Sequence, residues 1–461
     1  MPSTVLYRAT PSETFNKLTV SCWFKGMADG TQRSFWGLFD DNDSNKFFHL
    51  YYSSNGSLYG YWKQTSFIFT LGTTQKFRDP SAWYHFVMTM DTTLATAGDR
   101  IKFYVNGEQV TSFEDSLDTI TQNLDCDIMN GTTYGRMQLG GAKQSGTQYY
   151  WNGSMSHCHM CVGYAYDASY FGETDATSGI WKIKTGPSVS YGDNGGFWLK
   201  DGSQLTDSSP NSNTLTVGGG TLTPTKDNPS NNFPVMNPNM GEFGSAYGFN
   251  FSQGNLYVDT TSSNDCGVPA TFAMEGGKWY WEVSAGYVPS VQSACVGIVN
   301  TDKEWANAST GTGDPYGFVY VSNGQKKRDG TAASYGDDWG PATSGGDVIG
   351  VAYDVDNRKL YFSKNGTWQD SGDPTSGATG TGAAYTIPTG RIYMPYACER
   401  QSGYSAEFSF NFGNGYFGNQ AGAYTAISSP SADAAGIGAF KYAPPTGYYA
   451  LCTKNFKAYG G

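Results

Sequence analysis

The sequence predicts an all-β chain that folds into two antiparallel β-sandwich, jelly-roll-like domains joined by a linker rich in Pro, Asn and Ser. Three observations predict this class: Asn-Gly dipeptides recur along the chain, apolar residues alternate at a period of two, and aromatic residues are abundant. Because 461 residues exceed the usual domain size of about 100–200 residues, we expect more than one hydrophobic core.

The composition favours cores built from aromatic rings. Hydrophobic residues make up 38% of the chain, below the globular average of about 45–50%, but Phe, Trp and Tyr alone contribute 16%. Each ring buries about 150–250 Å² and favours strands, so a modest apolar fraction can still fill sandwich interiors. The 60 glycines are then expected in turns.

Turn signals and alternation divide the chain into hairpins. Asn-Gly suits the type I′ hairpin turn because both central residues need positive φ. It occurs eight times, at Asn55, Asn106, Asn130, Asn152, Asn194, Asn323, Asn365 and Asn414. One predicted strand places Tyr84, Phe86, Met88 and Met90 on one face and His85, Val87 and Thr89 on the other; a second sets Trp279, Trp281 and Val283 against Lys278, Tyr280 and Glu282.

A shift in composition marks the middle of the chain. From residue 201 to residue 239 the sequence is rich in Ser, Thr, Asn, Gly and Pro and has almost no periodicity. We therefore predict a first sandwich over residues 1–205, an extended linker over 206–245, and a second sandwich over 246–461. The prolines of the linker favour an extended, fairly stiff path.

Charge and hydropathy exclude several classes of partner. The net charge of −11 repels phosphate backbones, so we expect no binding to nucleic acid. No run of 18 apolar residues and no N-terminal signal pattern is present, so we expect neither membrane insertion nor secretion by a signal peptide. The eight cysteines are widely scattered and lack the density of a disulfide scaffold, so we expect reduced, mostly buried thiols.

The first half resembles the laminin-G-like, concanavalin A-type sandwich. The resemblance is carried by residues 76–110, KFRDPSAWYHFVMTMDTTLATAGDRIKFYVNGEQV, with an opening strand at 18–24 and a closing strand at 149–163. The continuation at 171–199, followed by the segments at 207–217 and 228–238, is similar to an arrangement in structural proteins of aquatic bacteriophages. This resemblance implies a virion protein.

The second half resembles a SPRY domain. The matching segments are GKWYWEV at 277–283, VGI at 296–298, and GDVIGVAYDVDNRKLYFSKNGTW at 346–368. The segments FNFGNGYFG and FKYAPPTGYYAL look like the final strand and C-terminal tail of that family. Both families are chiefly binding scaffolds, although a fold alone does not fix a function.

Catalytic chemistry finds little support in the sequence. Relatives of the laminin-G-like sandwich include glycoside hydrolases, which need two nearby carboxylates. Glu173 and Asp175 approach that pattern, but no acidic residue follows at Thr177 or Ser178, so the set is incomplete. The sequence has no Gly-x-Ser-x-Gly elbow and only four histidines. We therefore expect no enzymatic activity.

Two segments offer metal-ligating side chains. The loop Asp40-Asp41-Asn42-Asp43-Ser44-Asn45 supplies hard oxygens suited to calcium, with Asp40, Asp41, Asp43 and Asn45 as candidate ligands, although a solvated turn is the simpler interpretation. The run His157-Cys158-His159-Met160-Cys161 carries zinc-type ligands, but alternation on a strand separates them, which favours a buried strand. Otherwise we expect no cofactor.

Two aromatic groups are candidate binding residues. Tyr149, Tyr150 and Trp151 could stack on a sugar ring, although the start of a closing strand favours packing into the core. Tyr335 and Trp339 lie in a glycine-rich loop, and SPRY relatives bind partners through such loops. An exposed Tyr and Trp there would form a contact hot spot, whereas rings folded back over the domain edge would not.

These features together predict a virion structural protein exposed on a phage particle, as a head decoration, a head fibre or a tail-associated adhesin. It would be assembled in the host bacterial cytoplasm, and its partners would be other virion proteins and host-surface glycans. A homo-oligomer is compatible with this role, and a trimer would suit a spike. The alternative is a free or cell-associated carbohydrate-binding lectin module, and a hydrolase with an unrecognised site is a third option.

Overall fold

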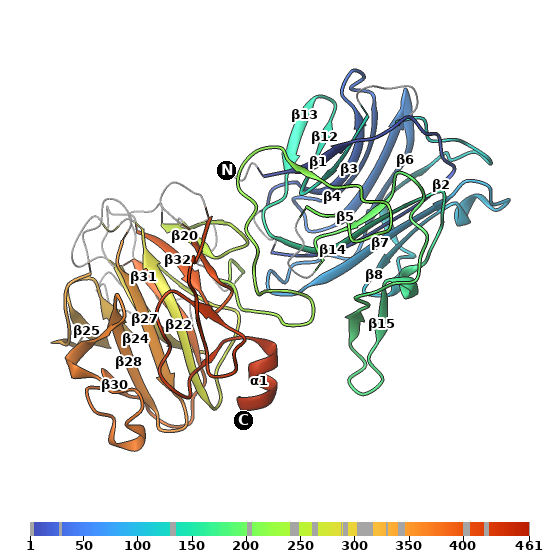
Figure 1. Cartoon of the computed structure of the whole chain (residues 1–461). Helices are drawn as coiled ribbons and strands as arrows, with labels where there is room; N and C mark the ends of the chain where they lie inside the picture. Colours follow the sequence, from blue (N-terminus) through green and yellow to red (C-terminus); the bar gives the residue numbers. More distant parts are fainter. Residues whose placement is uncertain are drawn as a thin grey trace. The chain divides into compact units, whose positions relative to one another are not determined.

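The computed structural model describes residues 4–26, 30–129, 135–200, 205–239, 249–260, 266–286, 288, 294–301, 317–328, 331–339, 346–399, 406–418 and 424–460. The chain forms two compact units, the first of residues 1–224 and 228–230 and the second of residues 225–227 and 231–461. Strands make up 47% and helix 5%, and the strands pair antiparallel except for β37 with β22, which confirms the predicted all-β class (Figure 1). Within the described ranges, no helix is long and apolar enough to cross a membrane.

The first unit is a sandwich of two antiparallel sheets. The eight-stranded sheet has the order β10 (Phe113–Asp118), β6 (Ser66–Thr73), β5 (Leu58–Gln64), β4 (Lys46–Tyr52), β3 (Arg33–Asp40), β11 (Gly135–Leu139), β1 (Leu6–Ala9) and β18 (Thr216–Val217). The six-stranded sheet has the order β17 (Gly196–Trp198), β14 (Ser154–Val162), β2 (Lys17–Lys25), β7 (Tyr84–Asp91), β8 (Ile101–Val105) and β9 (Glu108–Gln109).

Short elements complete the first unit. They are the hairpin of β12 (Gly141–Gln144) and β13 (Thr147–Tyr150), the hairpin of β15 (Gly172–Thr174) and β16 (Trp181–Ile183), and the 3-10 turns η1 (Ala97–Asp99) and η2 (Ala168–Tyr170). Figure 1 shows the β15 hairpin projecting away from the two sheets of its unit.

Alternation along the strands fills the core between these sheets. On β7, Phe86, Met88 and Met90 lie in that core, as the sequence predicts, while Val87 faces the opposite side. The spacing works because successive side chains of a strand point to opposite faces. Each fully buried side chain of this size stabilises the fold by about 1.5–3 kcal/mol relative to exposure.

A second apolar layer covers the outer face of the six-stranded sheet. Val87 and Cys161 pack there against Phe171, Tyr191 and Phe197, which belong to the segment that follows β14. The same layer encloses the ring of His85, which stacks between the indoles of Trp23 and Trp181 at centroid distances of 4.7 and 6.0 Å. Burial lowers the pKa of His85 to about 3, so this imidazole is neutral at physiological pH.

The second unit is also a sandwich. Its nine-stranded sheet has the order β19 (Phe249–Ser252), β20 (Tyr257–Thr260), β32 (Glu407–Asn411), β22 (Lys278–Ala285), β27 (Val348–Asp354), β28 (Lys359–Lys364) and β29 (Thr367–Trp368), with β30 (Tyr385–Thr386) beside β28 and β37 (Tyr449–Ala450) parallel to β22. Its six-stranded sheet has the order β21 (Cys266–Pro269), β31 (Tyr393–Glu399), β23 (Ala294–Asn300), β24 (Gly317–Val321), β25 (Gln325–Arg328) and β26 (Thr331–Ser334).

Short elements also complete the second unit. They are the pair of β33 (Tyr416–Gly418) and β34 (Tyr424–Ala426), the pair of β35 (Ser431–Ala432) and β36 (Ala439–Phe440), the 3-10 turns η6 (Gln369–Ser371) and η7 (Gly377–Thr379), and the helix α1 (Thr453–Tyr459).

A buried carboxylate fastens the C-terminal segment to strand β22. Glu282 is fully buried and accepts hydrogen bonds from the backbone N–H groups of Lys441 and Tyr442 at 2.9 and 2.8 Å. The amide of Asn411 and the hydroxyl of Tyr280 donate to the same carboxylate at 3.1 and 3.2 Å. Burial outweighs these donors and raises the pKa of Glu282 to about 7.

The segment expected to be an extended linker packs onto the units instead. Strand β18 pairs with β1, and Leu215 lies in the core of the first unit. The buried carboxylate of Asp207 accepts the backbone N–H groups of Phe197 and Asn213, both at 2.8 Å. Further along, residues 233–236 contribute three side chains to the core of the second unit. Leu215 alternates only with Val217, and Phe233 only with Val235, and such short runs do not predict strands, so the sequence pattern did not reveal them.

Among the described residues, the Asn-Gly pairs at Asn55, Asn106, Asn323 and Asn365 each join two adjacent antiparallel strands, although not all of them have the expected type I′ geometry. Among the described Asn-Gly pairs, both residues have positive φ at Asn106 and at Asn365, and each of these pairs joins two adjacent strands. At Asn55, Asn323 and Asn414 the asparagine lacks positive φ and only the glycine adopts it. Asn130 lies outside the described residues.

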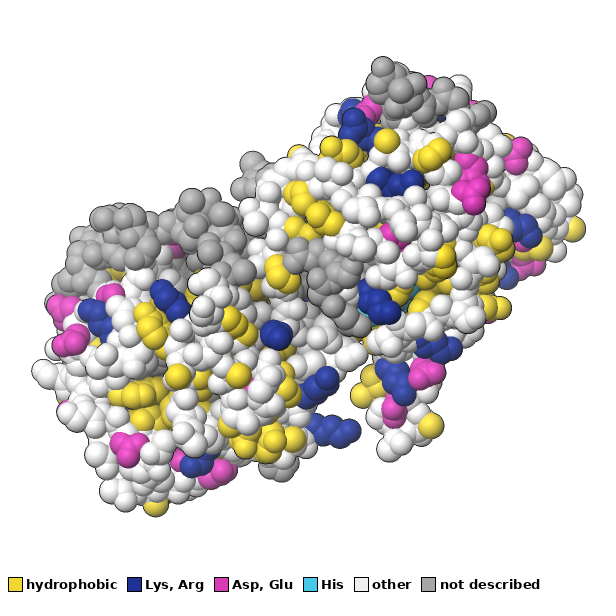
Figure 2. Space-filling model, in the orientation of Figure 1, with side chains coloured by type: hydrophobic (Ala, Val, Ile, Leu, Met, Phe, Trp, Pro, Cys, Tyr) yellow, Lys and Arg dark blue, Asp and Glu magenta, His cyan; other side chains and the backbone are white. Residues whose placement is uncertain are grey.

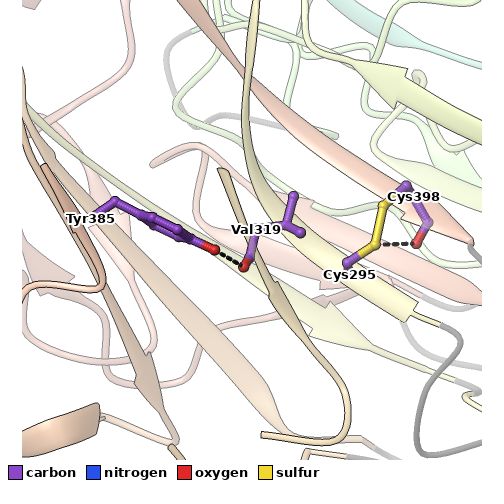
Figure 3. Close-up of a disulfide and its surroundings, with 4 residues drawn as sticks. All are labelled: Cys295, Val319, Tyr385 and Cys398. Carbon is purple, nitrogen blue, oxygen red and sulfur yellow. Dashed lines mark hydrogen bonds between the residues drawn. A yellow bond between two sulfur atoms is a disulfide. The ribbon is translucent and has the colours of Figure 1, made fainter. Parts of the chain in front are cut away.

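One expectation about the cysteines is wrong. Cys295 on β23 and Cys398 on β31 form a disulfide, with the two residues directly opposite each other in the strand register (Figure 3). They are 103 positions apart in the sequence, and only the pairing of two distant strands brings them together. Five other cysteines are buried, and no disulfide joins them in the structure: Cys22, Cys126, Cys158, Cys161 and Cys452.

We predict that Glu282 makes the second unit less stable as the pH rises. Its pKa is higher in the folded chain than the ordinary value of 4.5, so the folded state binds the proton more tightly. The protonated Glu282 therefore adds up to about 3 kcal/mol to the free energy of unfolding. This stabilisation is present in full below pH 4.5 and is lost as the pH rises to about 7. Glu282→Gln should abolish this dependence and, at pH 5, cost about 1–3 kcal/mol because its amide N–H groups face backbone donors.

Urea unfolding followed by tryptophan fluorescence at pH 5 and pH 8 measures both effects. Glu275→Gln is the matched control, because Glu275 is an exposed glutamate of the same unit. It should change the free energy of unfolding by less than about 0.5 kcal/mol. An identical pH profile for the Glu282→Gln variant and the unmodified chain would contradict titration of Glu282 in this range.

Candidate functional site

The outer face of the eight-stranded sheet in the first unit is lined with aromatic rings. Strands β4 and β5 each send alternate residues into the core, Phe48 and Leu50 from one and Trp62 from the other. The residues between them therefore point outward. We call the outward group the tyrosine face; it consists of Phe47, His49, Tyr51, Tyr59, Tyr61, Phe67 and Tyr149.

The rings of the tyrosine face form one connected cluster. Tyr51 lies at its centre, with ring centroids 4.8 Å from His49, 5.2 Å from Tyr59 and 5.1 Å from Tyr61. The cluster continues to Phe67, whose centroid is 5.9 Å from that of Tyr61. At the other end the ring of Tyr149, from the β12–β13 hairpin, lies 6.0 Å from His49. Aromatic pairs at these spacings support one another and hold the surface rigid.

Exposure varies across the tyrosine face. Tyr51 and Tyr59 are buried by their neighbours, whereas Tyr61 and Tyr149 are half-buried and Phe67 is 42% exposed. The ammonium of Lys63 lies 5.3 Å from the centre of the Phe67 ring, a cation–π contact at the edge of the cluster. The accessible part of the face therefore combines apolar ring surface with hydroxyl and ammonium groups.

Acidic side chains hold one end of the cluster in place. The hydroxyl of Tyr59 donates to Glu114 and Asp115, at 2.9 Å in each case. Burial alone would raise the pKa of Glu114, but hydrogen bonds from Lys76, Ser57 and other donors lower it to about 2. Glu114 therefore stays ionised and anchors the tyrosine ring, which reduces the entropy that this face would lose on binding a ligand.

A small cavity adjoins the tyrosine face. It has a volume of about 270 Å³ and is lined by the loop at residues 40–44, the turn at 145–146, and the side chains of Phe39, Lys46, Phe47 and Lys143. Phe47 belongs to both the cavity and the tyrosine face, so the two features are continuous. A cavity of this size suits a sugar residue or another small polar group rather than a large ligand.

The loop predicted as a calcium site forms one wall of this cavity, and its side chains have protein partners. Asp41 is ion-paired with Arg136 and with Lys143, the latter at 3.2 Å. Asp40 and Asp43 each accept a backbone N–H two residues further on, at 2.9 Å. The amide oxygen of Asn45 accepts a hydrogen bond from Lys63 at 2.8 Å. Across the described part of the chain, no group of three or more His, Cys, Asp or Glu side chains could hold a metal ion.

Of the predicted binding aromatics, the structure brings only Tyr149 into the tyrosine face. Tyr150 is half-buried on the same strand. Trp151 is 5% exposed and packs against Phe24 in the core, with ring centroids 5.2 Å apart. Core packing, the alternative that the sequence favoured, is therefore correct for Trp151.

Tyr335 and Trp339 are folded back into the second unit. Trp339 is fully buried and Tyr335 is 6% exposed, and both rings pack on Tyr320 at centroid distances of 6.1 and 5.6 Å. The pair therefore presents no exposed hot spot to a partner. Their glycine-rich surroundings resembled an exposed loop, but this loop closes over the edge of the domain.

The acidic residues Glu173 and Asp175 do not form a catalytic pair. They lie on the projecting β15–β16 hairpin, where Lys182 is ion-paired with both, at 3.3 and 3.4 Å. Figure 2 shows basic and acidic side chains close together on this projection. Backbone and side-chain hydrogen bonds, chiefly those from Ser178 and Thr177, lower the pKa of Asp175 to about 2. A glycosidase acid needs a raised pKa, whereas that of Asp175 is lowered, and both carboxylates are held by the same lysine on the surface of the hairpin.

Sequence reasoning missed most of the tyrosine face. The signal was present in KFFHLYYSSNGSLYGYWK, where aromatic residues alternate on both sides of an Asn-Gly pair. Both faces of this hairpin are aromatic, so alternation alone does not reveal which set points into the core.

The comparisons with known proteins agree with this architecture. Residues 5–160 match the model of the concanavalin A-like lectin/glucanases superfamily, and residues 278–413 match the model of the SPRY domain. No curated protein matches the sequence.

Similar solved structures cover parts of the chain. The SPRY domain of human HERC1 is 16% identical, with 34% of this chain and 87% of that chain covered and a TM-score of 0.26. The heptameric SAP-like pentraxin from Limulus polyphemus is 15% identical, with 47% of this chain and 88% of that chain covered and a TM-score of 0.29. The CBM40 of Ruminococcus gnavus IT-sialidase, bound to α2,3-sialyllactose, is 19% identical, with 33% of this chain and 79% of that chain covered and a TM-score of 0.25. On the family matches, the chain contains a concanavalin A-like domain followed by a SPRY domain.

Proposed function

We propose that this chain is a non-enzymatic, lectin-like protein of a phage particle surface, whose first unit binds carbohydrate on the tyrosine face. The observation that carries the proposal is the connected cluster of rings, of which Tyr61, Phe67 and Tyr149 are partly exposed, beside a small polar cavity. Aromatic rings complement the apolar faces of sugars, while nearby hydroxyl, ammonium and carboxylate groups can bond their hydroxyls.

The rigidity of the tyrosine face supports a binding role. Its rings stand on paired strands rather than on a free loop, and Tyr59 is tied to Glu114 and Asp115. A surface that is already ordered loses little conformational entropy when a ligand binds. Each sugar contact would still be weak, so repeated copies on a particle would be needed to give useful avidity.

The virion setting rests on the sequence between the two domains. The segments around residues 171–238 are similar to an arrangement in structural proteins of aquatic bacteriophages, and both family matches are to domains that commonly serve as binding scaffolds. A head decoration, a head fibre and a tail-associated adhesin are all compatible with this setting. Other virion proteins would then be its attachment partners, and a homo-oligomer such as a trimer would multiply its contacts.

We predict that removing the exposed rings weakens glycan binding. Tyr61→Ala and Phe67→Ala should each reduce affinity by about tenfold, or about 1.4 kcal/mol, because each removes ring surface that a sugar would contact. The measurement is binding of the full chain to a glycan array, followed by calorimetric titration of any glycan that the unmodified chain binds. Tyr459→Ala is the matched control, because Tyr459 is a comparably exposed tyrosine, 42%, in the second unit.

The control should bind as the unmodified chain does, and all three variants should keep its far-UV circular dichroism. Full glycan binding by both the Tyr61→Ala and Phe67→Ala variants would contradict the assignment of the tyrosine face, as would the absence of any bound glycan.

We predict that a chelator leaves glycan binding intact. The charge of Asp41 is already balanced by Arg136 and Lys143, and Asn45 accepts a hydrogen bond from Lys63, so calcium would have to displace these partners. Affinity measured in EDTA should therefore differ from that in millimolar calcium by less than about twofold. Loss of binding in EDTA that is restored by calcium would instead assign the loop at residues 40–45 as a calcium site.

We predict that the chain is a component of the purified particle. Mass spectrometry of density-purified virions should detect it at a fixed ratio to the major capsid protein, and electron microscopy should place it at a symmetric surface position. Its absence from virions, together with free protein that still binds glycans, would favour the alternative of a free or cell-associated lectin module.

A further inference from the structure

Two sulfur atoms in the core of the first unit lie unusually close together. Cys22 Sγ on β2 and Cys158 Sγ on β14 are 2.8 Å apart, and both side chains are buried. Carbon atoms that are not bonded already keep about 3.5–4.0 Å apart, and sulfur is larger than carbon. Two free thiols would therefore be expected to pack further apart, whereas a covalent S–S bond brings the atoms to about 2.05 Å.

A β-bulge aims the two side chains at each other. Ser156 pairs with Trp23 and His159 pairs with Ser21, so Cys22 alone on β2 faces two residues on β14, His157 and Cys158. His157 has a φ of 47°, a backbone conformation that is uncommon for residues other than glycine. Bulges of this kind redirect side chains, and this one turns Cys158 into the core toward Cys22.

The surroundings do not suit a metal site or a reactive thiol. Cys22 and Cys158 lie among apolar side chains, including those of Val20, Phe24 and Met160. Zinc would need two further ligands, and within the described residues no group of three His, Cys, Asp or Glu converges here. Burial also raises the pKa of Cys22, which disfavours a metal-binding or nucleophilic thiolate.

The second unit contains a cross-strand disulfide, between residues that are direct register partners rather than at a bulge. Cys295 and Cys398 are partners on adjacent antiparallel strands, and their sulfurs are joined (Figure 3). We propose that Cys22 and Cys158 form a second cross-strand disulfide in the mature protein. It would join strands whose cysteines are 136 positions apart in the sequence.

The bond would form by exchange with a small-molecule disulfide such as glutathione disulfide. One cysteine thiolate attacks the reagent and releases one thiol, which leaves a mixed disulfide on the protein. The second cysteine then attacks the protein sulfur and releases the second thiol. The cysteine pair loses two electrons and two protons, and the reagent gains them. Because both sulfurs are buried in the folded unit, the exchange takes place before β2 and β14 close.

Differential alkylation of the full chain tests the proposal. The chain is refolded with a glutathione redox pair, denatured without reductant, treated with iodoacetamide and analysed by peptide mass spectrometry. Cys22 and Cys158 should be unlabelled and their peptides linked, and both should become labelled once the chain is reduced first. Cys126 and Cys161, which are also buried, should be labelled in both samples. Full labelling of Cys22 and Cys158 before reduction would overturn the proposal.

A thermal measurement separates the bond from simple packing. Cys22→Ser should lower the Tm of the first unit by about 10 °C without reductant, because a disulfide across a long loop restricts the unfolded chain. In reductant this difference should largely disappear. Cys161→Ser is the matched control, and its effect should be the same in both conditions. A Cys22→Ser effect that is equally large with and without reductant would also overturn the proposal.

Discussion

The structure depends on one constraint: the central strands of both units are buried on both faces. In the first unit the outer face of β2, β7 and β14 lies under a second apolar layer that includes Phe171 and Phe197. In the second unit the C-terminal segment reaches β22 and supplies the backbone donors to Glu282. Polar residues on these strands cannot reach water, so each needs a protein partner. This constraint explains why the ring of His85 is stacked between two indoles. It also explains why the carboxylate of Glu282 accepts four hydrogen bonds.

The eight-stranded sheet of the first unit is covered less completely, because, of the described strands, only those of the β12–β13 hairpin pack on its outer face, at β3 and β4. In the first unit the covering segment lies on the six-stranded sheet, and the rings of the tyrosine face lie on the eight-stranded sheet. That face stays accessible at Tyr61 and Phe67, while its more deeply placed rings are closed off by one another. The chain therefore uses aromatic side chains in two places: between the sheets, where they form the core, and on the outer face of the eight-stranded sheet, where they form a partly polar surface. A binding role needs only the rings on the outer face, which the rings of the core support from beneath.

The sequence predicted the alternation of β7, the all-β class and both domain matches, because these depend on local patterns and on motifs such as GKWYWEV. It did not predict contacts between distant strands. Cys295 and Cys398 each lie in an ordinary apolar strand, and only the strand register places them opposite each other. Tyr335 and Trp339 were hard to place for a related reason, since a polar, glycine-rich loop can extend into solvent or fold over its own domain. The bulge at His157 is a third case, because no residue type there demands positive φ.

The projecting hairpin of β15 and β16 offers a practical use. Its tip, residues 176–180, is exposed throughout. Gly179 has a positive φ of 71°, and, apart from its chain neighbours, no other residue would lie within 4 Å of a Cβ atom added there. Loop tips of this kind tolerate inserted sequence because little packing is disturbed. A short epitope or a fluorophore-acceptor peptide placed there would leave both sandwiches and the tyrosine face untouched. Single molecules of the chain could then be labelled and followed by light microscopy.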